Sequence, residues 1–341
     1  MQIKLLSLTV RNCGALKDIK IDFTDNEQPQ SVIVLGGANG SGKTTVLELI
    51  FELAALFQLD QKMKPIQEIL MQTEYAEMEL LVDDEKHRVF FYNALFSNEH
   101  QLPQKDNNQH EPVYQVSFDN VQGWVMQHSD ISEKMNRLIT LNQGKPINFF
   151  HSSSHSNQTD HIPSVLYFPH NRELLPMAGE QVHREEVKYQ WCYRYQNSYR
   201  FPGSLESYLI WLDYAESDIF QSVIDFLNQL DFEGKTFHIH RKTLSVLVKT
   251  RDGSEHAINQ LSSGEQNLLI MLLELRRRLI PESIVLLDEI ENSLHPAFQH
   301  RLAQKLLQLQ RQISFQLILT THQPIFVKIF GDNCTRILTE F

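Results

Sequence analysis

The sequence predicts an α/β fold in which short buried strands alternate with helices. Three short runs support this prediction, because each is mostly apolar and leads into polar residues: Ser31–Leu35, Ser283–Leu287 and Leu317–His322. Apolar runs of this length are typical of strands that are buried on both faces of a sheet. After the first run, residues 44–59 carry apolar side chains at helical spacing, so a strand, a glycine-rich loop and a helix follow one another.

The rest of the chain divides into further strands, helices and polar loops. At the N-terminus, residues 2–10 and 18–23 read as two strands on either side of the turn Asn12-Cys13-Gly14. Further predicted elements are paired strands within 75–96, a core strand at Ser164–Pro169, one or two helices from Ser204 to about Leu230 with Ser204 as N-cap, and a hairpin over 235–250 about Arg241-Lys242, followed by a turn at Asp252-Gly253. The polar stretches 98–112 and 151–163 are predicted to be loops.

The composition is that of a globular protein without a membrane helix. Its 341 residues suffice for about two domains or one large α/β domain, with 42% hydrophobic and 21% charged residues. No apolar run reaches the ~20 residues of a membrane helix and no signal-peptide pattern is present, so we expect a cytoplasmic protein. The net charge of −11 argues against a coating of positive charge for nucleic acid, but it allows a local basic patch.

The cysteines offer no further chemistry. Cys13, Cys192 and Cys334 are isolated and form no CxxC pair, so the sequence predicts neither a zinc site nor a disulfide framework.

The glycine-rich loop after the first strand has the spacing GxxxxGKT. We expect the following residues to contact a nucleotide: Gly37, Ala38, Asn39, Gly40, Ser41, Gly42, Lys43, Thr44 and Thr45. Glycines let the backbone bend so that its amides approach phosphate oxygens, and the next helix points its N-terminus at the same anion. Lys43 is expected to reach the β- and γ-phosphates and to act in catalysis, and Thr44 to hold Mg²⁺ through its hydroxyl.

Acidic residues and a histidine follow the other two strands. Asp288 comes directly after Ser283–Leu287, where its carboxylate can bind Mg²⁺ directly or through water. Glu289 is next, and we expect it to point to the other face of the strand end and to polarise the attacking water. His322, at the end of the third strand, is expected to donate a hydrogen bond to the γ-phosphate.

A second anion site is predicted at the start of a helix that runs to about Leu279. Ser262 or Ser263 can cap this helix, Gly264 leaves its amides exposed, and Glu265 follows in the first turn. The first loop already supplies this chemistry for one nucleotide. The second site is therefore expected to serve the γ-phosphate of ATP bound to another copy, so that two copies enclose two nucleotides.

In these motifs the chain resembles the ATP-binding-cassette (ABC) type of ATPase, a P-loop NTPase fold with a mixed central sheet, helices and an inserted, more helical signature lobe. The resemblance matches Gly37–Thr44 to Walker A, Leu261–Gln266 to the signature motif, Ile284–Glu289 to Walker B, Asn292, Ser293 and Leu294 to the D-loop, and His322 to the switch histidine. The opening strands are similar to the RecF, SMC and OLD-like group, and the segments Glu289–Pro296 and Thr321–Pro324 to small ATPases of bacterial anti-phage and toxin–antitoxin modules. The resemblance implies one ATPase head over 1–341, with a nucleotide-binding lobe of 1–170 and 280–341 and a signature lobe of 171–279.

One expected residue of that group is absent. A glutamine that contacts Mg²⁺ and water usually follows a strand midway along the chain, but here the strand leads into Pro169-His170-Asn171-Arg172. Either His170 or Asn171 can substitute for it. The long coiled coil of the SMC-like proteins is also absent.

Two stretches are candidates for contacts with a partner. His183 to Phe201 interleaves basic and aromatic residues, which suits nucleic-acid stacking, a protein hot spot or simple packing. Arg276-Arg277-Arg278 ends the signature helix, where cations complement the helix dipole.

Three functions remain open from the sequence. The first is an ATP-driven dimeric motor or sensor that can contact DNA or another nucleic acid and works in repair or phage defence with a separate effector protein. The second is the ATP-binding subunit of a membrane transporter. The third is a nucleotide-gated scaffold that holds a toxin inactive.

Overall fold

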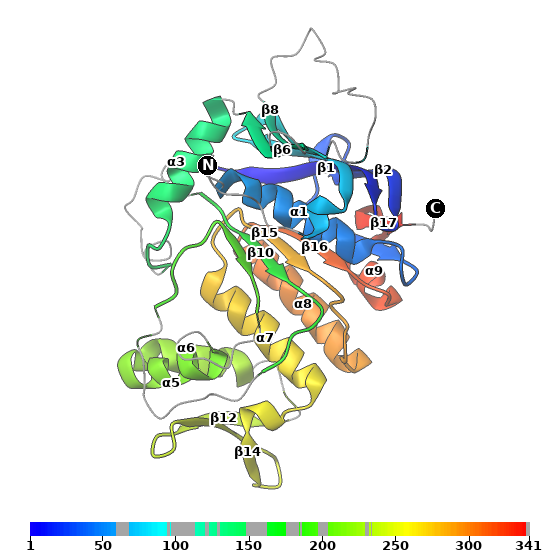
Figure 1. Ribbon diagram of the computed structural model, residues 1–341. Helices are drawn as coiled ribbons and strands as arrows, with labels where there is room; N and C mark the ends of the chain where they lie inside the picture. Colours follow the sequence, from blue (N-terminus) through cyan, green and yellow to red (C-terminus); the bar gives the residue numbers. More distant parts are fainter. Residues whose placement is uncertain are drawn as a thin grey trace.

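A computed structural model covers residues 1–341. It describes 1–58, 68–93, 96, 113–119, 123–127, 130–147, 162–174, 184, 186–196, 204–228, 232 and 234–338, with the backbone alone within 113–133. Figure 1 shows a layered molecule, with one sheet at the top, a helix beneath it, a second sheet, and further helices below that.

A six-stranded parallel sheet forms the centre of the fold. Its strand order is β11 (Cys192–Arg194), β10 (Val165–Phe168), β15 (Ile284–Leu287), β16 (Gln316–Thr320), β5 (Val32–Gly37) and β17 (Thr335–Leu338). Successive side chains alternate between two cores, as in β15, where Ile284 and Leu286 face one core and Val285 and Leu287 face the other. Strands β5, β15 and β16 are buried on both faces, which confirms the prediction from their short apolar runs.

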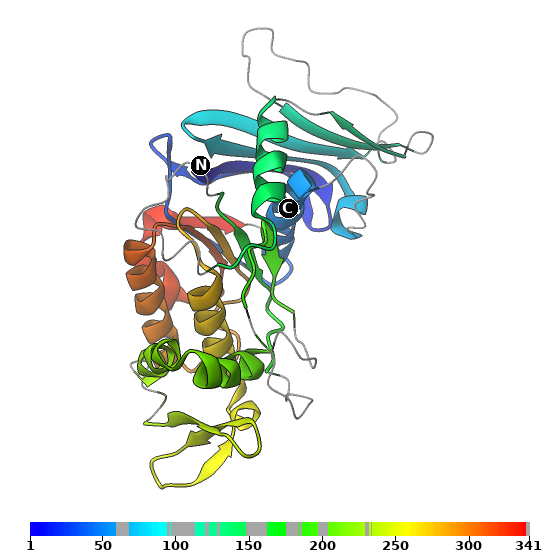
Figure 2. The same cartoon turned by 90° about the vertical axis from the view of Figure 1, so that its left-hand side faces the viewer.

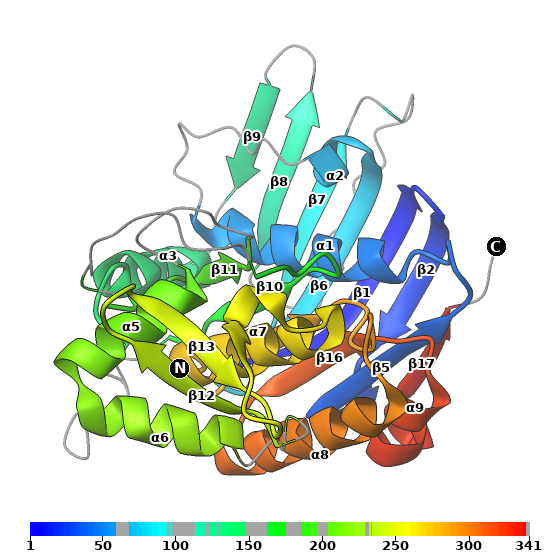
Figure 3. The ribbon, with the colours of Figure 1, turned by 90° about the horizontal axis from the view of Figure 1, so that it is seen from below.

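The second sheet covers one face of the first through a single helix. Its strand order is β2 (Leu16–Asp22), β1 (Ile3–Cys13), β6 (Thr73–Val82), β7 (Glu85–Asn93), β8 (Val113–Asp119) and β9 (Gly123–Gln127). All neighbours are antiparallel except β7 and β8. Helix α1 (Lys43–Ala55) lies between the two sheets and contacts strands of both (Figure 3).

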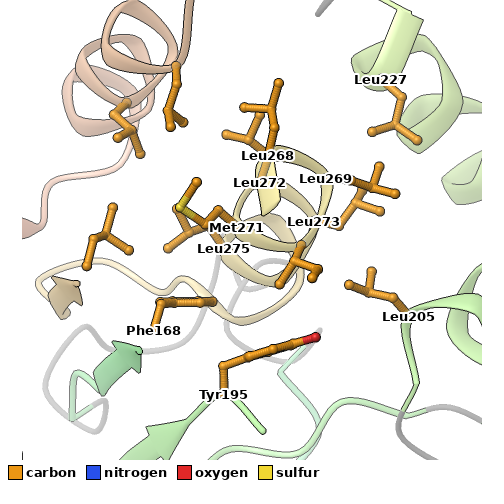
Figure 4. Packing of buried hydrophobic residues seen from close by; sticks show 14 of the residues in the cluster. Phe168, Tyr195, Leu205, Leu227, Leu268, Leu269, Met271, Leu272, Leu273 and Leu275 are labelled. Carbon is orange, nitrogen blue, oxygen red and sulfur yellow. The ribbon is translucent and has the colours of Figure 1, made fainter. Parts of the chain in front are cut away.

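Helices pack on the other face of the parallel sheet. They include α7 (Ser263–Arg278), α8 (Pro296–Gln312) and α9 (Pro324–Phe330), with α5 (Leu205–Ala215) and α6 (Ser217–Asn228) packed beyond α7. In Figure 4, leucines of α7 point outward on several sides, toward Phe168 and Tyr195 on one side and toward Leu205 and Leu227 on another. Since α7 is apolar around most of its circumference, it is a buried helix that joins the sheet to α5 and α6.

The remaining described elements are small. They are β3 (Thr24–Asp25), β4 (Gln28–Pro29), α2 (Glu68–Met71), α3 (Asp130–Asn142) and the antiparallel sheet β12 (Thr236–His240), β13 (Ser245–Lys249) and β14 (Glu255–Ala257), with 3-10 turns at Leu56–Gln58, Ile258–Gln260 and Asp332–Cys334. Figure 2 shows the small sheet at the opposite end of the molecule from the large antiparallel one.

One buried side chain joins the two large sheets. Gln316 of β16 is fully buried, and its Nε2 donates to the carbonyls of Leu5 (2.9 Å) and Gln30 (3.0 Å). Its Oε1 accepts from the backbone N–H of Leu5 at 2.7 Å. The register of β1 shifts between Leu5 and Ser7, so Gln316 satisfies backbone groups at an irregular point of the antiparallel sheet.

For the described residues the structure confirms the predicted helices and strands, but the first turn lies at Gly14-Ala15, because β1 continues to Cys13, which pairs with Leu16. Two helices begin at Leu205, with the Ser204 hydroxyl accepting from the Ser207 N–H at 3.1 Å as the predicted N-cap. The hairpin over 235–250 is β12–β13. The predicted loop at 98–112 and residues 151–161 of the predicted loop at 151–163 lie outside the described residues.

The aromatic and basic segment before α5 is largely core. Tyr189, Trp191 and Tyr195 are buried, and Trp191 Nε1 donates to the carbonyl of Ala54 at the end of α1. Arg194 lies over the ring of Tyr167 and pairs with α1 carboxylates. Of the three interpretations, packing therefore fits the described residues, because their aromatic faces are not available to nucleic acid.

Candidate functional site

The glycine-rich loop leads from β5 into α1. Gly40 and Gly42 have φ angles of 81° and 88°, which residues other than glycine rarely adopt. Gly42 precedes α1 without a side-chain cap, so backbone amides at the helix N-terminus are available to an anion. A Cβ at Gly42 would lie 2.5 Å from Leu16, so the turn between β1 and β2 closes against this loop. The loop fits a phosphate group at the first turn of α1.

The other predicted residues of the loop differ in exposure. Ala38, Asn39 and Gly40 are exposed at its tip, Ser41 is buried, and Thr44 and Thr45 are partly buried.

Lys43 folds back over its own loop. Its Nζ donates to the carbonyls of Gly37 at 3.0 Å and Ala38 at 2.7 Å, and the residue is buried. Burial lowers the pKa of Lys43, and the carboxylates of Glu289 and Asp288 act against this shift. The loop thus holds a cation that can be turned toward phosphate oxygens.

Asp288 is the point where the separate segments meet. Its fully buried carboxylate accepts hydrogen bonds from Thr44 Oγ1, 3.0 Å from both oxygens, and from Thr320 Oγ1 at 2.8 Å. His170 Nδ1 lies 3.2 Å from its Oδ2. A buried carboxylate and a hydroxyl from the loop are oxygen donors of the type that Mg²⁺ prefers. Thr44 and Asp288 therefore fit the predicted metal site.

A buried arginine that the sequence analysis missed fixes the backbone beside Asp288. Arg172 Nη1 donates to the carbonyls of Pro169 (2.8 Å) and Asp288 (2.9 Å), and its Nη2 donates to that of Glu289 (3.1 Å). Burial lowers the pKa of Arg172 to about 10, so the guanidinium stays charged at neutral pH. The side chain clamps the segment after β10 to the turn after β15.

Glu289 lies in a turn rather than on an extension of the strand. Its φ is 43°, in the left-handed region that costs a residue other than glycine about 1 kcal/mol. Its N–H donates to Thr320 Oγ1 at 2.7 Å and its carbonyl accepts from Arg172. The position is thus held from two sides, and the partly buried carboxylate adjoins the metal-site residue Asp288.

His322 lies two residues after β16, with an exposed side chain. Its backbone N–H donates to Glu291 Oε1 at 2.5 Å, which connects this loop to the turn after β15. The predicted contact of its ring with a γ-phosphate stays a prediction.

The predicted second anion site has the expected helix, but two of its residues, Ser262 and Glu265, bind each other as the helix cap. Ser262 is the N-cap of α7: its hydroxyl accepts from the Glu265 N–H, and the Glu265 carboxylate accepts from the Ser262 N–H. Glu265 is buried and pairs with Lys235 at 2.5 Å. Ser263 is exposed at the first helical position, so its N–H and hydroxyl are the groups best placed for a ligand.

Gly264 packs against the D-loop of its own chain. A Cβ at this position would lie 2.3 Å from the carbonyl oxygen of Ser293 and 3.4 Å from Cα of Leu294. Asn267, one turn further along α7, donates from Nδ2 to the carbonyl of Asn292 at 3.0 Å. The start of α7 and the predicted D-loop residues Asn292, Ser293 and Leu294 therefore form one packed unit.

The same unit contacts the residues of the predicted metal site. Asn292 Nδ2 donates to the carbonyl of His170 at 3.2 Å, and His170 contacts Asp288. The structure thus brings together Thr44, Asp288 and the predicted D-loop residue Asn292. The sequence predicts the meeting of the loop with Asp288, and the approach of Asn292 is added by the structure.

Comparison with known proteins places the chain in a family. Residues 32–328 match the family model described as "AAA domain, putative AbiEii toxin, Type IV TA system". The chain belongs to this family of AAA domains. It is 21% identical to the "Retron Vc95 probable ATPase" of Vibrio cholerae, over 94% of this chain and 71% of that protein. It is 34% identical to the "Retron Ec83 probable ATPase" of Escherichia coli, over 23% of this chain and 16% of that protein.

Similar solved structures include SMC heads and ABC cassettes. An SMC head domain from Thermotoga maritima aligns with a TM-score of 0.45 and 14% identity, over 96% of this chain and 92% of that one. A dimeric bacterial ABC transporter cassette aligns with a TM-score of 0.40 and 15% identity, over 99% and 94%. The family match agrees with the α/β fold of this chain, in which a parallel sheet carries the glycine-rich loop at the end of β5.

The described residues lack two features. None of the helices in that part of the chain is both long and apolar enough to span a membrane. Among the same residues, no group of three or more histidine, cysteine, aspartate or glutamate side chains is arranged to hold a metal ion by itself.

Proposed function

We propose that this chain is an ATPase that binds ATP with a divalent cation and hydrolyses its terminal phosphoanhydride bond. One observation supports the proposal above all: Thr44 and Asp288, 244 positions apart in the sequence, share hydrogen bonds at the mouth of the glycine-rich loop. A divalent cation held there supplies charge neutralisation for the β- and γ-phosphates.

The chain's own residues have distinct proposed tasks. Amides of the loop and Lys43 bind the phosphates. Glu289, fixed in a left-handed turn, orients the attacking water and accepts its proton while the bond to the leaving ADP oxygen breaks. His322 donates a hydrogen bond to the γ-phosphate oxygens.

The active site is proposed to be completed by a second copy of the chain. Ser263 and the amide of Gly264 at the α7 N-terminus would contact the γ-phosphate bound to the facing molecule. Support comes from the geometry within one chain: the α7 N-terminus carries an exposed serine and lies against the D-loop. ATP binding would then close a dimer and hydrolysis would open it.

The biological role is proposed by analogy with the retron ATPases. The resemblance of Glu289–Pro296 and Thr321–Pro324 to ATPases of anti-phage and toxin–antitoxin modules favours a part in phage defence, with the chain as the motor or sensor of a complex that contains a separate effector. The family description, which names a toxin–antitoxin system, and the retron names of the relatives are consistent with it. Within the chain, residues 1–170 and 280–341 would form the nucleotide-binding lobe and 171–279 the signature lobe that moves with the partner's nucleotide, except for β11, which pairs with β10 in the central sheet.

Two variants test the proposal on the purified chain. Lys43→Ala should lose ATP binding in a calorimetric titration, because the loop loses its only described cation. Glu289→Gln should bind ATP, turn over slowly and accumulate as a dimer in size-exclusion chromatography. Unchanged affinity of the first variant would contradict the nucleotide site, whereas a monomeric second variant with tight ATP binding would contradict only the dimer.

A further inference from the structure

Asp288 has an unusual electrostatic position for a carboxylate. Its side chain is 0% exposed, yet among the described residues no lysine or arginine nitrogen lies within 4 Å of it. Arg172 reaches the backbone carbonyl of Asp288 and not its carboxylate. A buried carboxylate without a cationic partner is costly unless a metal ion or proton compensates its charge.

The nearest nitrogen of a titratable side chain is that of His170. Nδ1 of His170 lies 3.2 Å from Oδ2 of Asp288, while Thr44 approaches the same carboxylate from the first turn of α1. Three potential ligands, a carboxylate, a hydroxyl and an imidazole, thus converge at one place. We propose that His170 binds the nucleotide-bound divalent cation directly, through Nδ1. This inference rests on the proposed function.

The backbone of His170 is fixed in a way that supports this role. On one side, Arg172 binds the carbonyls of both Pro169 and Asp288, which holds the segment after β10 to the end of β15. On the other side, Asn292 donates to the carbonyl of His170. The imidazole is therefore presented from a constrained segment, although its side chain is 51% exposed. Ligands that are held by a second set of residues bind metal with less loss of entropy.

The donor set predicts a metal preference. Mg²⁺ prefers oxygen donors, whereas imidazole nitrogen suits the later divalent metals, whose affinity rises from Mn²⁺ to Co²⁺. With the imidazole of His170 beside a carboxylate and a hydroxyl, the site should prefer Mn²⁺ and Co²⁺ to Mg²⁺. This preference should be weaker when an amide oxygen replaces the imidazole. Coordination through Nδ1 leaves the ring proton on Nε2, at the exposed edge.

A competing explanation is an ion pair between protonated His170 and Asp288. In that case the nucleotide's metal would displace the ring, and no nitrogen would coordinate it. The two possibilities differ in the first coordination sphere of the metal, which can be observed without turnover.

The test uses the full chain with Mn²⁺ and a non-hydrolysable ATP analogue, studied by pulsed EPR after labelling the histidines with ¹⁵N. We expect a nitrogen coupling of a directly bound imidazole, lost in His170→Gln and retained in His322→Gln. His300→Gln, on the exposed side of α8, is the matched control and should retain it. Calorimetry should show the ratio of Mn²⁺ to Mg²⁺ affinity falling at least about tenfold in His170→Gln.

The outcomes separate this inference from the proposed function. If Mn²⁺ and the nucleotide bind but no nitrogen coupling appears, or if the coupling survives His170→Gln, the ligand assignment is wrong and the ATP site stands. If the coupling is lost in His322→Gln instead, the ligand is the other histidine. If no nucleotide binds with any metal, the proposed function itself fails.

Discussion

Replacing Gly264 by alanine separates packing within one chain from contact with a partner's nucleotide. In an open helix the change would stabilise the protein by about 1 kcal/mol, because alanine is the better helix former. Here the new Cβ would lie 2.3 Å from the Ser293 carbonyl oxygen and 3.1 Å from its carbon. Both are backbone atoms, so no side-chain rotation can relieve the contact.

The magnitude follows from these two opposing effects. The contact is about 1 Å shorter than ordinary van der Waals distance, so α7 and the D-loop have to separate. Overpacking of this kind costs about 1–3 kcal/mol, which outweighs the gain in helix propensity. We expect Gly264→Ala to lower the free energy of unfolding by up to about 2 kcal/mol without any nucleotide present.

Urea unfolding, followed by circular dichroism, measures this loss. Ser263→Ala is the matched control, since Ser263 occupies the preceding position but is exposed, and its variant should unfold within about 0.5 kcal/mol of the wild type. If Gly264→Ala is as stable as the wild type, the packing of α7 on the D-loop is wrong. If Gly264→Ala is stable but does not dimerise with ATP, Gly264 acts only through its contact with the nucleotide bound to the partner copy.

Two further changes test the buried polar groups. Gln316→Leu leaves the Leu5 N–H and the carbonyls of Leu5 and Gln30 without a hydrogen-bond partner, at a cost of about 1–3 kcal/mol each. Thermal denaturation should therefore show that the free energy of unfolding falls by about 3 kcal/mol or more. A fall below about 1 kcal/mol would contradict the bridging role of Gln316. Burial raises the pKa of Glu52 on α1 to about 7, above the value near 4.5 in the unfolded chain. The free energy of unfolding should therefore be highest below pH 4.5 and fall as the pH rises through 7, by at most about 3 kcal/mol. Glu52→Gln should remove this slope and melt higher than the wild type at pH 8, and parallel melting curves from pH 5 to 8 would refute the assignment.

The sequence predicts those parts of the site that depend on local pattern. The loop from Gly37 to Thr44 is recognisable because glycine spacing, a preceding apolar strand and a following helix occur within a few residues. The meeting of Thr44 with Asp288 is also predictable, since the carboxyl ends of parallel strands lie at one edge of a sheet. The structure adds that β16 lies between β5 and β15, an order that no local pattern contains.

Residues that act through long-range backbone contacts escape such reasoning. Arg172 follows an apolar strand by four residues, where an arginine is commonly exposed, and only the fold shows that its guanidinium binds the carbonyls after β15. Gln316 begins a strand and looks like a boundary residue, yet it is fully buried. In both cases the partners are backbone groups of distant segments, and backbone groups are the same at every position of a sequence.

The aromatic segment illustrates the opposite failure, in which a pattern fits several structures. Alternating basic and aromatic residues suit nucleic acid because rings can stack and cations can pair. They suit a core equally well when the rings turn inward and the cations pair with carboxylates, as Trp191 and Arg194 do. The two cases differ only in which face the neighbouring elements cover, and α1 covers this one.

The contacts of α7 determine how the nucleotide of the proposed partner copy would influence the proposed metal site. Asn267 binds the carbonyl of Asn292, Asn292 binds the carbonyl of His170, and His170 contacts Asp288. Each link is one hydrogen bond, worth about 1 kcal/mol, so the chain of bonds cannot by itself impose a large shift. The steric contact of Gly264 with Ser293 is stiffer, because it joins two backbones without intervening space. We therefore expect a displacement of the α7 N-terminus to reach the metal site mainly through movement of the D-loop backbone, with the side-chain bonds following it.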